Sequence, residues 1–304
     1  MTIARSAVIP DTRLGILMML GGMTLFTFND ALGKWLVTGY PVAMLLAIRG
    51  VGGMLVLAPM LARQGVAATF AVRRWPWHLL RVALVTVDAA LFYWAVRYLP
   101  LAEVMTIYMS APLIVTALSV PLLGERVGWR RWVAVCVGFA GVVLVLNPAG
   151  QFDPWPSIVA LIGALTFSLG LITTRVLRDD GNLTLVGYQT LGGCLLGAAA
   201  LPMGWVTPTP LDVVLLLLLG VVALGGHAAV NRSLQLSPAA VVVPFQYVSI
   251  LWAVALDLLV WSTVPSVQVA VGATLIIGSG LFVFHREQQV ARGVAAAAGG
   301  EGPP

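Results

Sequence analysis

The chain has 304 residues, of which 60% are hydrophobic and only 10% are charged, and its mean hydropathy is +0.97. Soluble globular proteins carry about 25% charged residues, so this composition excludes that class and indicates a membrane protein. The net charge of +5 does not indicate binding to nucleic acid, because the basic residues lie in short loops between apolar runs.

Ten long apolar segments follow one another along the chain. About 20 apolar residues are needed to cross a bilayer as a helix. Transmembrane strands would alternate in hydrophobicity over about ten residues, whereas these runs are continuous. We therefore predict an all-α membrane protein with ten transmembrane helices. Its spans are expected at about 14–36, 41–62, 76–97, 101–122, 128–147, 155–177, 182–203, 211–234, 238–261 and 265–285.

The basic residues predict the orientation of these spans. With the N-terminus inside, every Lys and Arg lies at an inner end except Lys34, Arg49 and Arg97. Loops rich in Lys and Arg stay in the cytoplasm, so both termini are expected there. Residues 1–13 would form a cytoplasmic arm without a signal-peptide cleavage pattern, and residues 286–304, rich in Ala, Gly and Pro, a disordered cytoplasmic tail.

The two halves of the chain resemble each other weakly. Pro100 is matched 138 positions later by Pro238, and Gly52-Gly53 is matched by Gly192-Gly193 at a similar offset. Each half would hold five spans, an odd number, so the second half would be inverted relative to the first. We expect a 5+5 inverted repeat, with residues 14–147 as the first unit and 148–285 as the second.

Several motifs resemble the EamA-type branch of the drug/metabolite transporter superfamily. They are Tyr98-Leu-Pro-Leu-Ala-Glu103 with Pro112, Leu123-Gly-Glu-Arg126, Gly138 with Gly141, Pro244-Phe-Gln-Tyr247, and Gly272 with Gly278 and Gly280. One departure is Thr263, where that family usually has a glutamate. The resemblance implies ten helices, a bacterial inner-membrane location and export of small metabolites, amino acids among them.

Charged residues within the spans are the first candidates for function, because ionisable groups at membrane depth are costly. Asp30 and Arg49 lie at a similar depth and could form a gating or structural ion pair; Asp30 could instead pair with Lys34 four residues on. Asp88 lies midway along span three and is the strongest candidate for a cavity or proton-carrying group. Glu103 and Asp257, nearer the span ends, are interpreted as solvated end residues.

Further cavity-lining candidates come from polar and aromatic residues within the spans. His227 and Asn231 are four residues apart and share one helix face. Pro112 and Pro244 should interrupt spans four and nine, and broken helices in matching halves mark the binding site in many transporters. The predicted cavity set is Asn29, Asp88, Tyr108, His227, Asn231, Phe245, Gln246, Tyr247 and Trp252.

Other sequence features argue against metal binding, phosphate binding and catalysis. Three histidines without ligand spacing make a metal site improbable, and no phosphate-binding loop, cofactor motif or catalytic set is present. Cys136 and Cys194 are interpreted as free thiols within spans. Gly193-xxx-Gly197 allows close helix packing, within the bundle by the favoured interpretation or in a homodimer by the other.

We predict a secondary transporter, not an enzyme, that exports small metabolites such as amino acids by alternating access around a cavity between the two repeats. Its partners would be the solute and membrane lipid. Three alternatives remain open at this point: a lipid-linked-sugar flippase on the same scaffold, an intramembrane enzyme using Asp88 and His227, and a channel.

Overall fold

The computed structural model describes residues 12–123, 128–146, 154–177, 180–237 and 242–299. All regular structure in these ranges is helical. The first half contains α1 (Thr12–Val37), α2 (Val42–Gln64), α3 (Val66–Phe70), α4 (Trp75–Tyr98), α5 (Leu101–Tyr108), α6 (Ala111–Leu123) and α7 (Trp129–Leu146). The second half contains α8 (Trp155–Val176), α9 (Asn182–Ala200), η1 (Leu201–Met203), α10 (Pro210–Leu236), η2 (Val243–Tyr247), α12 (Val248–Trp261) and α13 (Val267–Gly299).

The all-helical membrane class is confirmed. Nine helical segments in the described ranges are long and apolar enough to cross a membrane, and a tenth apolar segment, Phe245–Trp261, is shorter. Large apolar side chains lie on the outside of the bundle, as Leu259 and Val267 do at 79% exposure each. An outward apolar surface of this kind suits contact with lipid chains rather than water.

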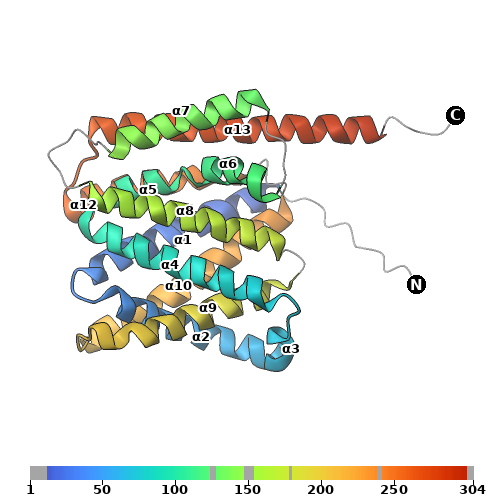
Figure 1. Ribbon diagram of the computed structural model, residues 1–304. Helices are drawn as coiled ribbons and strands as arrows, with labels where there is room; N and C mark the ends of the chain where they lie inside the picture. Colours follow the sequence, from blue (N-terminus) through green and yellow to red (C-terminus); the bar gives the residue numbers. More distant parts are fainter. Residues whose placement is uncertain (1–11, 124–127, 147–153, 178–179, 238–241, 300–304) are drawn as a thin grey trace, which may run out of the picture.

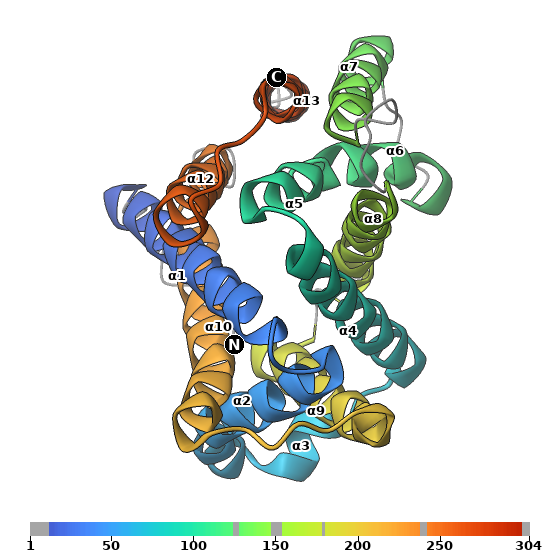
Figure 2. The ribbon, with the colours of Figure 1, turned by 90° about the vertical axis from the view of Figure 1, so that its left-hand side faces the viewer.

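The helices run roughly along one direction, and Figure 2 views them from one end. There α7 and α13 stand together at the top of the view, while α2, α3 and α9 lie at the bottom. Between these groups, α1 lies beside α10 on one side and α4 beside α8 on the other. The helix pairs α1 with α10, α4 with α8 and α2 with α9 each join the first half of the chain to the second.

Glycines allow the closest of these helix contacts. A Cβ added at Gly220 of α10 would lie 2.0 Å from the backbone oxygen of Arg49 in α2. A Cβ at Gly197 of α9 would lie 2.5 Å from the backbone nitrogen of Ala47, also in α2. The Gly197 end of the predicted GxxxG motif therefore packs inside the bundle, against α2. Small residues at membrane helix contacts commonly have this role.

Two helices are interrupted, near the predicted positions. Met109 and Ser110 separate α5 from α6, and the 3₁₀ helix η2 precedes α12. Pro112 is the second residue of α6, where its missing N–H removes no helical hydrogen bond. The break therefore lies just before Pro112 and not at it. Met109 and Tyr247, at the two breaks, are 138 positions apart, the same spacing as Pro100 and Pro238.

The predicted ends of the chain differ from the structure in one respect. Helix α13 continues to Gly299, whereas the sequence predicted disorder from residue 286. Ala is the best helix former, and residues 294–298 include four alanines that extend the helix. Most of the predicted N-terminal arm, residues 1–11, and the junction at 147–153 lie outside the described residues.

Candidate functional site: a central cluster between two end networks

A tyrosine that the sequence analysis did not select joins the predicted polar residues of α1 and α2. Tyr93 of α4 is 1% exposed, and its hydroxyl accepts a hydrogen bond from Arg49 Nη1 at 3.1 Å. Asn29 Nδ2 also lies 3.4 Å from this hydroxyl and 3.5 Å from Asp30 Oδ1. Gly33 makes room for the ring, because a Cβ there would lie 2.2 Å from Tyr93 Cε1.

The predicted contact between Asp30 and Arg49 is therefore indirect. No ion pair within 4 Å joins them in the described part of the chain. Arg49 donates to the Tyr93 hydroxyl, and Asn29 Nδ2 lies between this hydroxyl and the Asp30 carboxylate. The guanidinium also lies 5.7 Å from the centre of the Tyr93 ring. Asp30 does not pair with Lys34 either, because the Lys34 ammonium binds a carboxylate from the other half of the chain.

Asp88, midway along α4, binds the end of α5. The Tyr108 hydroxyl donates to Asp88 Oδ1 at 2.9 Å. Tyr108 is the last residue of α5 before the helix break, and a Cβ at Gly163 of α8 would lie 2.1 Å from its hydroxyl oxygen. The break and the glycine together place this phenol against the carboxylate.

These side chains form one electrostatic group, which we call the central cluster. Asp88 lies within range of the charges of both Asp30 and Arg49, and Tyr108 is within range of Asp30 and Asp88. The cluster consists of Asn29, Asp30, Arg49, Asp88, Tyr93 and Tyr108. It draws on α1, α2, α4 and α5, and so three of the predicted cavity residues and both predicted ion-pair residues come together here.

The remaining predicted site residues lie in other surroundings. His227 of α10 lies within electrostatic range of Arg49. Its ring packs edge-on against Phe26, with 4.8 Å between the ring centres. Tyr247 points to α13, where a Cβ at Gly280 would lie 2.3 Å from its hydroxyl oxygen. Trp252 packs on Phe28, on the exposed side of α1.

Two further predicted residues make no side-chain contact that bears on the cluster. Phe245 and Gln246 are partly exposed within η2, and the described residues give the Gln246 side chain no hydrogen bond. The side chain of Asn231 lies outside the described part of the structure. The central cluster is therefore built entirely from the first half of the chain, with His227 as its neighbour from the second.

A buried ion pair lies at one end of the bundle. Lys34 Nζ is 3.0 Å from Asp257 Oδ1, and it also donates to the Leu99 carbonyl at 3.1 Å. The Asp257 carboxylate accepts the backbone N–H groups of Leu101 at 3.0 Å and Ala102 at 2.7 Å. A carboxylate suits the first turn of α5, where N–H groups lack helical partners and the helix dipole is positive. We call this set the Lys34–Asp257 network.

The burial of Asp257 corrects an expectation from the sequence. The sequence predicted Asp257 as a solvated end residue, but Asp257 is 0% exposed. Pro100 and the residues before it form the turn that brings the α5 N-terminus against α12, and this turn supplies the carboxylate with donors. Glu103, by contrast, is partly exposed and accepts a hydrogen bond from Ser157 at 3.3 Å.

A second contact joins the two halves at the same end. Tyr40, in the turn between α1 and α2, donates to Asp212 Oδ2 of α10 at 2.6 Å. This hydrogen bond raises the pKa of the Tyr40 phenol, because ionisation would place two negative charges together.

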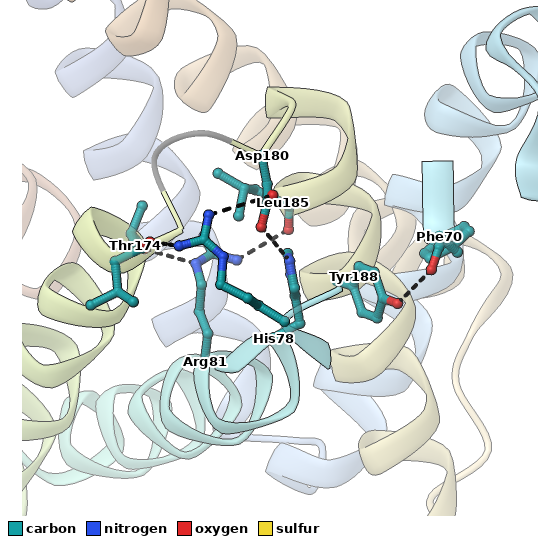
Figure 3. Close-up of polar contacts among 9 residues, drawn as sticks. Phe70, His78, Arg81, Thr174, Asp180, Leu185 and Tyr188 are labelled. Atoms are coloured by element: carbon teal, nitrogen blue, oxygen red, sulfur yellow. Dashed lines mark hydrogen bonds and ion pairs between the residues drawn. The ribbon is translucent and has the colours of Figure 1, made fainter. Parts of the chain in front are cut away.

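The opposite end is held by an arginine. Arg81, near the start of α4, donates to Thr174 Oγ1 at 2.7 Å, to the Leu185 carbonyl at 3.1 Å and to Gln189 Oε1 at 3.0 Å (Figure 3). These acceptors belong to α8 and α9, so a single guanidinium joins three helices. We call this set, with the residues described next, the Arg81 network.

A histidine–carboxylate hydrogen bond and an ion pair flank Arg81. His78 Nε2 lies 2.9 Å from Asp180 Oδ2, and Arg74 lies 3.9 Å from the same carboxylate. The His78 ring also stacks on Tyr188 at 4.6 Å, and the Tyr188 hydroxyl donates to the Phe70 carbonyl of α3 (Figure 3). The sequence analysis counted Arg74 and Arg81 only as charges of an inner loop, and no local signal indicated their partners about 100 positions away.

Comparison with known proteins places the chain in a family. A model of the EamA-like transporter family matches the chain twice, at residues 13–147 and 154–285. The chain belongs to the EamA-like transporter family. It is a member of the drug/metabolite transporter superfamily, a transporter and not an enzyme, and a multi-pass protein of the bacterial inner membrane.

Its relatives in the EamA-like family include transporters of two different molecules. The chain is 27% identical to a riboflavin transporter of Vibrio cholerae serotype O1, over 91% of this chain and 95% of the relative. It is 24% identical to an S-adenosylmethionine uptake transporter of Rickettsia prowazekii, over 90% of this chain and 94% of the relative. One solved crystal structure matches with a TM-score of 0.61 and 19% identity, covering 88% of this chain and 94% of that one, which supports the fold alone.

Two surface hollows of this EamA-like transporter are lined by residues outside the central cluster. One, of about 510 Å³, lies between α7 and α13 and is lined by residues that include Trp129, Val133 and Phe282. The other, of about 370 Å³, is lined by residues that include Val42 and Trp94. Both are strongly apolar, so neither offers the charges of the cluster. In the described residues no three His, Cys, Asp or Glu side chains gather as metal ligands.

Proposed function

We propose that this EamA-like protein is a secondary transporter that passes a small metabolite through the central cluster by alternating access. The observation that carries the proposal is the meeting of Asp30, Arg49 and Asp88 in the central cluster, between the two end networks. Ionisable groups at this depth are costly and commonly mark the path of a solute. Such a path agrees with the transport activity of the EamA-like family.

Two five-helix repeats would form the moving halves. The two matches of the family model support this division, as does the equal spacing of the helix breaks at Met109 and Tyr247. The helix contacts support a twofold relation between the halves, because α1 lies against α10 as α8 lies against α4. With five spans in each half, that relation would be an inversion. In this arrangement Phe245–Trp261 is the tenth span.

The two end networks would act as gates. Leu99, in the Lys34–Asp257 network, follows the end of α4, whereas Arg81 lies near its start. At about 1.5 Å per residue the two networks are about 27 Å apart along this helix. Each joins one repeat to the other, so we propose that opening the bundle at either end breaks the network there.

We further propose that both termini are cytoplasmic, because Lys and Arg gather at the corresponding helix ends. A cysteine at Thr38, in the exposed turn after α1, would then react with a membrane-impermeant maleimide in intact cells. A cysteine at Arg63, exposed at the end of α2, would react only after lysis. Both variants need Cys136 and Cys194 replaced. The reverse pattern would contradict this orientation.

For the substrate, we propose a heteroaromatic metabolite of the size of riboflavin or S-adenosylmethionine, the molecules named for two relatives. The rings of Phe92, Tyr108 and Phe167 pack together next to the cluster and suit such a molecule. Export of free amino acids, which the sequence analysis predicted, is the second candidate. Carboxylates and a guanidinium in one site suit the two charges of an amino acid.

The test is flux into proteoliposomes that contain the purified protein. Radiolabelled riboflavin, S-adenosylmethionine and a panel of amino acids would be compared in uptake and in counterflow, at equal and unequal pH. Saturable and competable flux of one compound supports the proposal, and Asp88→Asn should reduce it at least tenfold. Non-saturating flux would indicate a channel, and movement of a labelled lipid-linked sugar instead would indicate a flippase.

A further inference from the structure

We propose that the hollow between α7 and α13 binds an acyl chain of an anionic phospholipid, with Arg130 placed to hold the phosphate. The two helices lie together at the edge of the bundle (Figure 2), and each is the last helix of its half of the chain. A lipid held between them would contact both halves. It would belong to the surrounding membrane and not to the path of the transported solute.

Glycines bring α7 and α13 into contact and leave a hollow beside that contact. A Cβ at Gly141 of α7 would lie 2.8 Å from the backbone oxygen of Gly272. A Cβ at Gly138 would lie 3.1 Å from Ser279 Cβ, so the two helices run antiparallel. A Cβ at Gly278, by contrast, would meet no atom within 4 Å in the described part of the chain. The space beside Gly278 is the hollow of about 510 Å³.

The hollow has two apolar walls. On α13, Leu275, Gly278 and Phe282 are three and four residues apart and so share one helix face. On α7, Val133 and Val137 are four residues apart and do the same. Both valines and Phe282 remain exposed in the part of the chain that the structure describes. In a bilayer a lipid chain would cover them, because water is excluded from the hydrocarbon core.

The length of the hollow suits a lipid chain better than a helix of a second copy. From Arg130 to Val137 the lining of α7 extends about 10 Å, at about 1.5 Å per residue. One leaflet contributes about 15 Å of hydrocarbon, half of the core of about 30 Å, whereas a transmembrane helix needs the whole core. Starting from its charged end, the hollow therefore stays within one leaflet and takes part of one acyl chain.

Arg130 gives the hollow a basic end. Its guanidinium lies 5.5 Å from the centre of the exposed Trp129 ring, and the described residues give it no carboxylate partner. Arginine binds phosphate oxygens through paired N–H groups. Tryptophan is enriched where membrane helices meet the lipid headgroups. These two residues therefore mark the level of the lipid phosphate.

A second arginine lies at the same end of the pair. Arg286 follows Phe282 by four residues, so it continues the α13 wall, and the antiparallel packing puts it at the end that holds Arg130. It donates to the neutral side chain of Gln289, which does not cancel its charge. By the orientation proposed above this end is cytoplasmic, and basic pockets between helices on that side bind anionic headgroups. The charges therefore favour an anionic lipid over a zwitterionic one.

The experiment measures binding of dioleoyl-phosphatidylglycerol and dioleoyl-phosphatidylcholine to the purified full chain in detergent by native mass spectrometry. The two lipids have the same acyl chains and differ in the charge of the headgroup. A basic residue near a headgroup favours an anionic lipid about fivefold, so we expect at least that preference for phosphatidylglycerol. Equal binding of the two lipids would overturn the inference.

Matched variants locate the site. Arg130→Gln should lower the preference about fivefold, whereas Arg63→Gln, at an exposed basic residue of α2, should keep it. Gly278→Leu fills the hollow without changing a charge and should weaken phosphatidylglycerol binding about threefold or more, because the chain loses its contacts with the walls. Gly21→Leu, which has open space on α1, should not weaken it.

Arg130 is exposed and Gly278 has room, so both variants should fold. Unchanged phosphatidylglycerol binding in either folded variant would contradict the site. If Gly278→Leu does not fold, Arg130→Gln and the lipid preference of the unmodified protein decide.

A second copy in the hollow would give a different result. The spectra would then show a dimer that Gly278→Leu separates into monomers, with no preference between the two lipids, and this would overturn the inference. The measurement does not use flux, so failure of the proposed transport function would leave the lipid site standing, and failure of the lipid site would leave the transport function standing.

Discussion

The two ends of the bundle are held together by different chemistry. The Lys34–Asp257 network depends on one ion pair with side-chain exposures of 10% and 1%. The Arg81 network spreads the bonds of one guanidinium over neutral acceptors, and its flanking carboxylate, Asp180, keeps 24% of its side-chain surface exposed. We therefore expect the Lys34–Asp257 network to fail completely when one partner is lost, and the Arg81 network to weaken in steps.

The largest effect is expected from Asp257→Ala. It would leave the buried Lys34 ammonium with the Leu99 carbonyl but without a counter-charge, and would remove the acceptor of two N–H groups of α5. Breaking a buried ion pair from one side costs about 3–5 kcal/mol. Thermal unfolding in detergent would measure the loss of stability.

A second variant tests the reason for that loss. Lys34→Met combined with Asp257→Leu removes both charges and should restore part of the stability, since a buried ion pair can often be replaced by apolar residues. The Leu101 and Ala102 N–H groups still lack their acceptor, so the recovery should be incomplete. If the double variant is as unstable as Asp257→Ala, the unpaired charge is not the cause.

A smaller effect is expected at the other end, from Arg81→Met. Thr174 and Gln189 would lose a donor, and unsatisfied buried polar groups cost about 1–3 kcal/mol. Arg81→Lys keeps the charge but cannot reach three acceptors at once. Its stability should therefore lie between those of the unmodified protein and Arg81→Met. A destabilisation by Arg81→Met larger than that by Asp257→Ala would reverse the comparison.

The centre of the bundle can be tested between these ends. In Gly33→Ala the new methyl group would meet the Tyr93 ring, and overpacking of this kind costs about 1–3 kcal/mol. Gly21→Ala on the same helix has open space and should instead stabilise by about 0.5–1 kcal/mol. Unfolding of the two variants would be compared, and equal shifts would show that Tyr93 yields to the added group.

The smallest effect is expected from Asp180→Asn. Its ion pair with Arg74 is partly exposed on both sides, and such pairs contribute about 0–1 kcal/mol, screened further by salt. The asparagine can still form a hydrogen bond with the buried His78 ring. Stability measured at low and high salt should differ less in this variant than in the unmodified protein. A loss above 2 kcal/mol would mean that Asp180 belongs to the rigid part of the Arg81 network.

Much of the candidate site could be predicted from sequence because charges stand out in apolar spans. Asp30, Arg49 and Asp88 were selected on that ground, and they do share one cluster. Tyr93 was missed, since a tyrosine in a membrane helix has no distinctive local pattern. The residues of η2 and α12 were predicted as cavity-lining from a proline-broken helix, a pattern that places the break but not the direction of each side chain.

The class of the protein and the course of its helices follow from the sequence alone, because long continuous apolar runs can satisfy their backbone in a membrane only as helices. Which charges meet depends on the folded bundle. Lys34 does not pair with Asp30, four residues away on its own helix. It binds Asp257 of α12, 223 positions away. Asp257 is already held by the N–H groups of α5 and is fully buried, and such a carboxylate takes a cation that only the folded bundle can bring to it.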